Sequence, residues 1–131
     1  MDFESFAFSL LDTEPAVFGV AVIDSNWNIA YQTENWDLSQ DLGPLKEIAV
    51  EAKKPEGEAK NPGSLGIMKI KYMIVEFTPE RVIATNVARK GHIILAPIEK
   101  GALVCYIDPN KGPRDALFNV QTFAQKLKGN V

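Results

Sequence analysis

The sequence predicts one α/β (α+β) domain over residues 1–131, in which a central antiparallel β-sheet of about six strands carries the N- and C-terminal helices on one face and a middle helix on the other. Three observations support this fold class. The chain of 131 residues is long enough to bury one core without disulfides or metals. Apolar residues recur at helical spacing near both ends and once in between. Between the helices, runs of strand-forming residues are separated by short turns, which is typical of antiparallel neighbours.

The first half of the chain predicts a helix, a hairpin and a second helix, in that order. Residues 2–11 place apolar side chains on one helical stripe, with acidic residues in the first turn, where the helix dipole favours them. The run over 17–24 is nearly all apolar, as expected for a strand covered on both faces, and 29–33 returns after a Ser-Asn-Trp-Asn turn. A proline suited to the first helical turn opens the middle helix over 44–54, and the polar segment 53–66 is expected to be an exposed loop.

The second half predicts strands followed by a closing helix. Strands are expected over 66–77, 81–87, 92–98 and 101–107, joined by turns that contain proline, glycine and charged residues. The helix over 114–128 has one apolar stripe and carries lysines near its end, where cations interact favourably with the helix dipole. The two terminal helices should therefore pack side by side on one face of the sheet.

The composition indicates a protein of the reducing cytoplasm. The first 15 residues carry acidic residues where a signal peptide would need basic ones, and no apolar run reaches the length of a membrane span. The single cysteine, Cys105, lies within an apolar run, so we expect a buried, inert thiol and no internal disulfide.

The charges of the two halves differ in sign. Residues 1–60 hold 12 acidic and 4 basic residues, a net charge of −8, whereas residues 61–131 hold 5 acidic and 10 basic residues, a net charge of +5. Either the folded surface has two electrostatic characters, or folding mixes the halves and leaves no patch. Nothing in the chain resembles the strongly basic footprint of a nucleic-acid-binding protein.

The residues that carry chemistry do not form a catalytic pattern. His92 is the only histidine, and no His, Cys, Asp and Glu cluster has metal-ligand spacing. The chain lacks a Gly-x-Ser-x-Gly nucleophile motif, and the Asn-Pro-Gly-Ser-Leu-Gly segment lacks the lysine of a phosphate-binding loop. We therefore expect no enzyme activity, no catalytic residues, no cofactor and no metal.

Two features point instead to binding. The first half is rich in aromatic residues, and Trp27 and Trp36 fall in a turn and a polar loop, where a large apolar side chain is unexpected. Tryptophan is enriched at binding hot spots, but both residues could instead cap the edge of the core. The second feature is a basic set on neighbouring strands and a turn, which is either a partner surface or a solvated strand face. That set comprises Lys69, Lys71, Arg81, Arg89 and Lys90.

The whole chain resembles the profilins. The stretch over 70–109, with a Lys-Tyr-Met-Ile strand, an acidic turn, Val-Ile, a basic Arg-Lys-Gly turn and an Ala-Leu-Val strand, keeps the profilin order and spacing. In the first half, Phe3 and Phe6 stand in the place of an N-terminal aromatic pair, and the first hairpin and the proline-started helix also match. The acidic first half and the altered aromatic set are most similar to archaeal, Asgard-type profilins.

The resemblance implies a monomeric, non-enzymatic cytoskeletal protein that binds monomeric actin at its barbed-end face, suppresses nucleation and regulates actin polymerisation. Profilins use a face built from the late strands and the start of the C-terminal helix, and a basic face suits an acidic actin surface. Transferred to this chain, the actin-binding residues would be Lys71, Met73, Arg81, Arg89, Lys90, His92, Lys111, Gly112, Arg114 and Asp115.

Two further profilin ligands are polyproline and phosphoinositides. A polyproline groove would draw on Phe3, Phe6, Trp27, Tyr31 and Phe123. Phenylalanine lacks the hydrogen-bond donor that would hold a proline carbonyl, and Ala30 stands where profilins have the strand tryptophan, so we expect weak or absent polyproline binding.

Phosphoinositides and other anionic phospholipid head groups would be attracted to a cluster of cations. The resemblance places this cluster at Lys69, Lys71, Arg89 and Lys90.

Two other small α/β folds fit parts of the same pattern. One is a roadblock- or longin-like scaffold that dimerises or holds a GTPase, although it has fewer late strands. The other is a PAS-like sensor domain, which would need a cavity for a small ligand.

Overall fold

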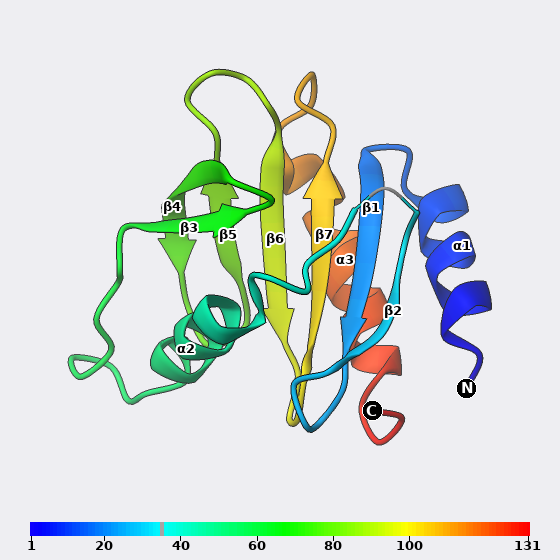
Figure 1. Cartoon of the computed structure of the whole chain (residues 1–131), viewed down its shortest axis with the longest axis horizontal. Helices are drawn as coiled ribbons and strands as arrows, with labels where there is room; N and C mark the ends of the chain where they lie inside the picture. The colour runs from blue at the N-terminus through cyan, green and yellow to red at the C-terminus, as the bar shows by residue number, and fades with distance from the viewer. Residues whose placement is uncertain (35) are drawn as a thin grey trace.

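The computed structural model describes residues 1–34 and 36–131, and within them a seven-stranded sheet lies between two layers of helix (Figure 1). The helices and strands follow one another along the chain as α1 (Phe3–Thr13), β1 (Val17–Ile23), β2 (Ile29–Gln32), α2 (Leu42–Ala52), β3 (Ser64–Ile67), β4 (Ile70–Phe77), β5 (Val82–Thr85), β6 (His92–Pro97), β7 (Ala102–Ile107) and α3 (Pro113–Lys126).

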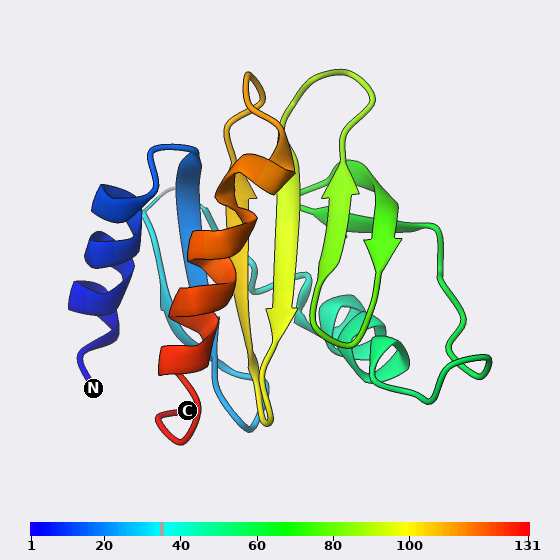
Figure 2. The same ribbon diagram turned by 180° about the vertical axis from the view of Figure 1, so that it is seen from behind.

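The sheet is antiparallel throughout, with the order β2-β1-β7-β6-β5-β4-β3. α1 and α3 pack next to each other on the side of β1, β6 and β7, and α2 lies on the opposite face (Figures 1 and 2). The predicted fold class and the placement of the three helices are therefore confirmed.

The predicted number of strands was too small by one. The single strand expected over 66–77 is a hairpin, in which Ile67 pairs with Ile70 around Met68 and Lys69. Both turn residues adopt left-handed backbone angles, with φ of 51° and 67°. Two-residue hairpin turns of this kind are usually marked by asparagine or glycine, and neither stands here, so the turn had no signal in the sequence.

The middle helix begins earlier than predicted. α2 starts at Leu42, so Pro44 is its third residue, where the backbone N–H still has no partner within the helix and proline is tolerated. The loop expected over 53–66 ends at residue 63, because Ser64–Ile67 forms β3.

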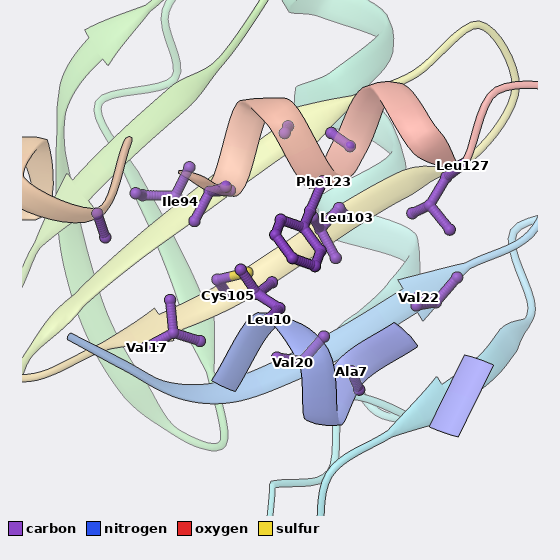
Figure 3. Close-up of a cluster of buried hydrophobic side chains, with 14 of the residues drawn as sticks. Ala7, Leu10, Val17, Val20, Val22, Ile94, Leu103, Cys105, Phe123 and Leu127 are labelled. Atoms are coloured by element: carbon purple, nitrogen blue, oxygen red, sulfur yellow. The ribbon is translucent and has the colours of Figure 1, made fainter. Parts of the chain in front are cut away.

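The core has two clusters, one on each side of the sheet. The first lies under α1 and α3, and Figure 3 shows Leu10 of α1 and Phe123 of α3 directed toward Leu103 and Cys105 of β7. The second lies toward α2 and includes Ala21 and other side chains that alternate with those of the first cluster. Apolar residues on both faces of β1 and β7 explain their nearly unbroken apolar sequences.

Cys105 is fully buried in the first cluster, as predicted. Burial raises the pKa of its thiol, which keeps the sulfur protonated and unreactive. No helix among the described residues combines the length and the hydropathy that a membrane crossing requires.

Candidate protein-binding surface

α3 covers only part of its face of the sheet. It packs on β6 and β7, and Ile83 of β5 is buried in the same cluster, but the same face of β4 and the Thr85 end of β5 stay uncovered (Figure 2). On β4 the side chains of Lys71, Met73 and Val75 are exposed, whereas Tyr72 between them is buried in the second cluster on the other side. We call this uncovered region the β4–β5 surface.

An ion-pair cluster joins the β4–β5 surface to the start of α3. Glu76 of β4 accepts hydrogen bonds from Arg81, which precedes β5, and from Arg114 in the first turn of α3. A register shift between Ile74 and Glu76 pairs Glu76 with Ile83, and so turns its carboxylate to the α3 side. Arg114 first, and then Arg81, hold the pKa of Glu76 below its usual value.

The β5–β6 loop presents two further cations. The side chain of Asn86 organises this loop, because its Oδ1 accepts from the backbone N–H of Ala88 at 2.8 Å and of Lys90 at 3.2 Å. Its Nδ2 donates to the Lys71 carbonyl oxygen at 2.8 Å, which fixes the loop to β4. Arg89 has a left-handed φ of 62°, and both it and Lys90 are exposed.

His92 lies at the base of the same surface rather than on its exterior. Met73, Thr85 and His92 occupy successive register positions across β4, β5 and β6. The histidine is half-buried, with Nδ1 2.9 Å from the Thr85 hydroxyl, and its Nε2 is buried without a hydrogen-bond partner in the described part of the chain. Its side chain therefore offers a partner less area than those of the two β5–β6 loop cations.

The segment between β7 and α3 completes the surface. Lys111 is exposed, and the Gly112 N–H donates to Asp115 Oδ2 at 3.1 Å. Asp115 thus caps the start of its own helix, which orients the first turn and the neighbouring Arg114.

All ten residues expected to bind actin thus come from adjoining segments: β4, the residue before β5, the β5–β6 loop, the first residue of β6, the β7–α3 turn and the first turn of α3 (Figure 2). The structure shows how they lie, and their role in binding stays a prediction.

Sequence reasoning missed the most exposed aromatic residue near this surface. Phe118 of α3 is 79% exposed. It falls outside the apolar stripe of its helix, which buries Ala116, Val120, Phe123 and Ala124. An aromatic residue off the buried stripe of an amphipathic helix is the signal that could have identified it.

The residues expected to form a polyproline groove only partly come together. Phe6 and Phe123 meet edge to face with ring centroids 5.6 Å apart, and Phe3 and Tyr31 pack against the same cluster. Trp27 does not join them, because it packs against the second cluster on the other side of the sheet, which corrects that part of the prediction.

The aromatic pair that does form is largely closed to a ligand. Phe6 and Phe123 are only 7% and 4% exposed, and Lys126 Nζ lies 4.1 Å from the Phe123 ring centroid.

Trp36 is a core residue. It is 9% exposed, and its ring centroid lies 6.2 Å from that of Tyr106. Of the two interpretations of the tryptophans, the structure supports capping of the core for Trp36 and partial packing on the core for Trp27.

The four residues expected to attract phosphoinositides are all exposed. Lys69 lies in the β3–β4 turn, Lys71 on β4, and Arg89 and Lys90 in the β5–β6 loop. Binding of lipid head groups by these residues stays a prediction. Among the described residues, no group of histidine, cysteine and acidic side chains has the geometry of a metal site.

Comparison with known proteins gives a consistent result, although no family model matches the chain. Loki profilin-1 of Lokiarchaeum sp. is 47% identical over 127 residues, which cover 95% of this chain and 93% of the relative. Odin profilin of Odinarchaeota yellowstonii is 29% identical and covers 97% of both chains.

Solved structures of profilins also superpose on this chain. The complex of Loki profilin-2 with rabbit actin contains a chain that superposes with a TM-score of 0.91 at 42% identity over 100% of both chains. Profilin IB of Acanthamoeba castellanii, at 16% identity, shares the fold with a TM-score of 0.75 and covers 95% of this chain and 94% of its own. On this similarity along nearly the whole chain, the protein belongs to the profilin family, as an Asgard-type member.

Proposed function

We propose that this profilin binds monomeric actin through the β4–β5 surface and the adjoining loops, and that it thereby suppresses filament nucleation. The observation that carries the proposal is the similarity to two Loki profilins solved in complex with rabbit actin, which are 42% and 43% identical to this chain and align with all of it. Membership of the profilin family also argues against the two alternative hypotheses, the GTPase scaffold and the PAS-like sensor.

The physical basis is complementarity of shape and charge between this surface and actin, with no covalent step. A rigid sheet holds the β4–β5 surface in one shape, and the basic residues around it suit an acidic partner. Charges at the rim of an interface mainly raise the association rate and favour the correct partner. A monomer whose barbed-end face is covered cannot join a second monomer through that face, so nucleation slows.

The test is an actin polymerisation assay with rabbit actin, with and without the purified protein. We expect a longer lag that grows with protein concentration. The matched variant carries Arg89→Glu and Lys90→Glu, both in an exposed loop and remote from the core. Its association rate should fall at low salt, and its dependence on salt concentration should weaken. An unchanged lag with the wild-type protein, with rabbit actin and with an actin from the same source, would reject the proposal.

The remaining expectations follow from the same proposal. We place the protein in the cytoplasm, with the cytoskeleton, as a monomer. Because the Phe6–Phe123 pair is buried, a proline decamer should bind weakly or not at all. Isothermal titration that gives a micromolar dissociation constant would contradict this expectation.

A further inference from the structure

The β4–β5 surface has an apolar centre. Met73 is 39% exposed, Val75 is 61% exposed and Phe118 is 79% exposed. Met73 lies between Tyr72 and Ile74, which pack toward the second cluster, so its side chain points to the α3 side of β4. Val75 is the residue without a register partner at the shift between Ile74 and Glu76, and its side chain is exposed.

Phe118 belongs to the same surface by its place on α3. It follows Arg114 by four residues and precedes Gln121 by three, so all three share one helical stripe. That stripe faces the uncovered strands, because Arg114 bonds Glu76 of β4 and Gln121 Oε1 accepts from Arg81 at 3.5 Å. Phe118 therefore stands between the two points at which α3 is tied to the β4–β5 side.

Burial of Phe118 does not explain its presence. The side of α3 that packs on the sheet is already filled by other residues, and a phenylalanine that is 79% exposed adds little to the core. Large apolar side chains grouped on a surface and bordered by polar residues mark interaction sites.

The two arginines on this side of α3 already form ion pairs within the protein. Arg81 and Arg114 both donate to Glu76, so an acidic partner would have to compete with a bonded carboxylate to engage them. In contrast, Lys71, Arg89 and Lys111 form no ion pair within residues 1–34 and 36–131.

We propose that Phe118, on the same side of the sheet as the exposed Met73, is the apolar anchor of this surface and sets the dissociation rate of the complex with monomeric actin. The exposed cations at the rim set the association rate. This inference rests on the proposed function and adds to it the residue on which the lifetime of the complex depends. The occupant is actin, because a basic rim around an apolar centre complements the acidic surface expected of actin and opposes self-association through like charge.

The test compares Phe118→Ala with Phe8→Ala. Phe8 is 51% exposed on α1, away from the β4–β5 surface, so its variant controls for loss of an exposed phenylalanine. Binding to immobilised monomeric rabbit actin is followed in real time, and thermal unfolding checks that both variants fold. Because Phe118 is exposed and alanine favours helices, its variant should unfold at or above the wild-type temperature.

We expect Phe118→Ala to raise the dissociation rate at least about 30-fold, which corresponds to the loss of a hot-spot residue, with the association rate changed less than about threefold. Phe8→Ala should bind like the wild type. A Phe118→Ala protein that dissociates at the wild-type rate would reject the anchor and leave the proposed function intact. A wild-type protein that binds no actin would reject the proposed function itself. Light scattering that shows a wild-type dimer dissociated by Phe118→Ala would assign the patch to a second copy of this chain and overturn the proposal.

Discussion

Gly91 controls how the β5–β6 loop joins β6, and Gly91→Ala is the sharpest test of that geometry. The residue has a φ of +111°, which side chains other than glycine rarely adopt. An added Cβ would lie 2.5 Å from Tyr106 Cε1 and 2.9 Å from the Ile107 carbonyl oxygen. Neither atom can move easily. The Tyr106 hydroxyl donates to the Lys90 carbonyl oxygen at 2.7 Å, and Ile107 pairs with β6 through its backbone.

The expected cost has two parts. The positive φ costs a non-glycine residue about 1–2 kcal/mol. Overlap with a fixed ring and a fixed carbonyl adds about 1–3 kcal/mol, as for other overpacked sites. The free energy of unfolding should therefore fall by about 2–5 kcal/mol, which lowers the midpoint of urea denaturation by about 1–2.5 M at a denaturant slope of about 2 kcal/mol/M.

Gly57→Ala separates the two parts. Gly57 also has a positive φ, +89°, but an added Cβ would meet nothing within 4 Å. That variant should lose about 1 kcal/mol or less, since alanine also restricts the unfolded chain. If urea denaturation gives the same loss for Gly91→Ala as for Gly57→Ala, the contact with Tyr106 and Ile107 does not constrain the loop and the reasoning is wrong.

Three further predictions concern the ion-pair cluster and the core. Glu76→Gln should lower the free energy of unfolding by about 1 kcal/mol at pH 7. Because the pKa of Glu76 is lower in the folded state, its ionised form stabilises the fold above the pKa of the unfolded state, and this stabilisation is lost as the pH falls through the folded-state pKa. In chemical denaturation, the free energies of unfolding of the wild type and the variant should therefore converge below pH 4.5. A difference that stays constant with pH would contradict the ion pair. Cys105 should react with a thiol reagent only as the protein unfolds, because its sulfur is buried and its pKa is raised, and fast labelling of native protein would refute this. Leu10→Ala, at a fully buried position between α1 and the sheet, should cost about 2–5 kcal/mol in denaturant unfolding, and a loss below 1 kcal/mol would show that the site collapses around the cavity.

The sequence allowed the helices, most strands and their layers to be predicted, because each depends on local periodicity. The β3–β4 turn could not be predicted, since Met68 and Lys69 adopt left-handed angles without the residues that usually mark them. The Met68 N–H donates to the Asp41 carboxylate at 3.0 Å, and the Asp37 N–H to Met68 Sδ at 3.3 Å. Contacts with residues about 30 positions earlier thus support this turn, and no short window of sequence contains them.

The position of Trp36 depends on distant residues in the same way. A Cβ added at Gly19 would lie 3.0 Å from the Trp36 ring, so the absence of a side chain on β1 makes room for the indole. The polar residues around the tryptophan left both exposure and capping of the core open, whereas the missing side chain at Gly19 lets the indole lie against the sheet. Only the pairing of β1 with the segment after β2 brings these two positions together.

The candidate site shows that the charges in a sequence predict the sign of a surface better than they predict which of its cations are free of ion pairs. The basic second half predicted either a positive face or a mixed surface, and in the structure the β4–β5 surface is bordered by lysines and arginines. Yet Glu76 neutralises the charges of Arg81, five positions away in the sequence, and of Arg114, 38 positions away. The second ion pair forms only once α3 packs beside β4. Among the described residues of this surface, the cations that remain available to a partner are Lys71 on β4 and those on the loops. Arg81 and Arg114 are both bonded to Glu76, so the centre of the surface presents mainly apolar area to a partner. For that reason, the lifetime of the complex should depend on the apolar residues, and the association rate on the exposed cations.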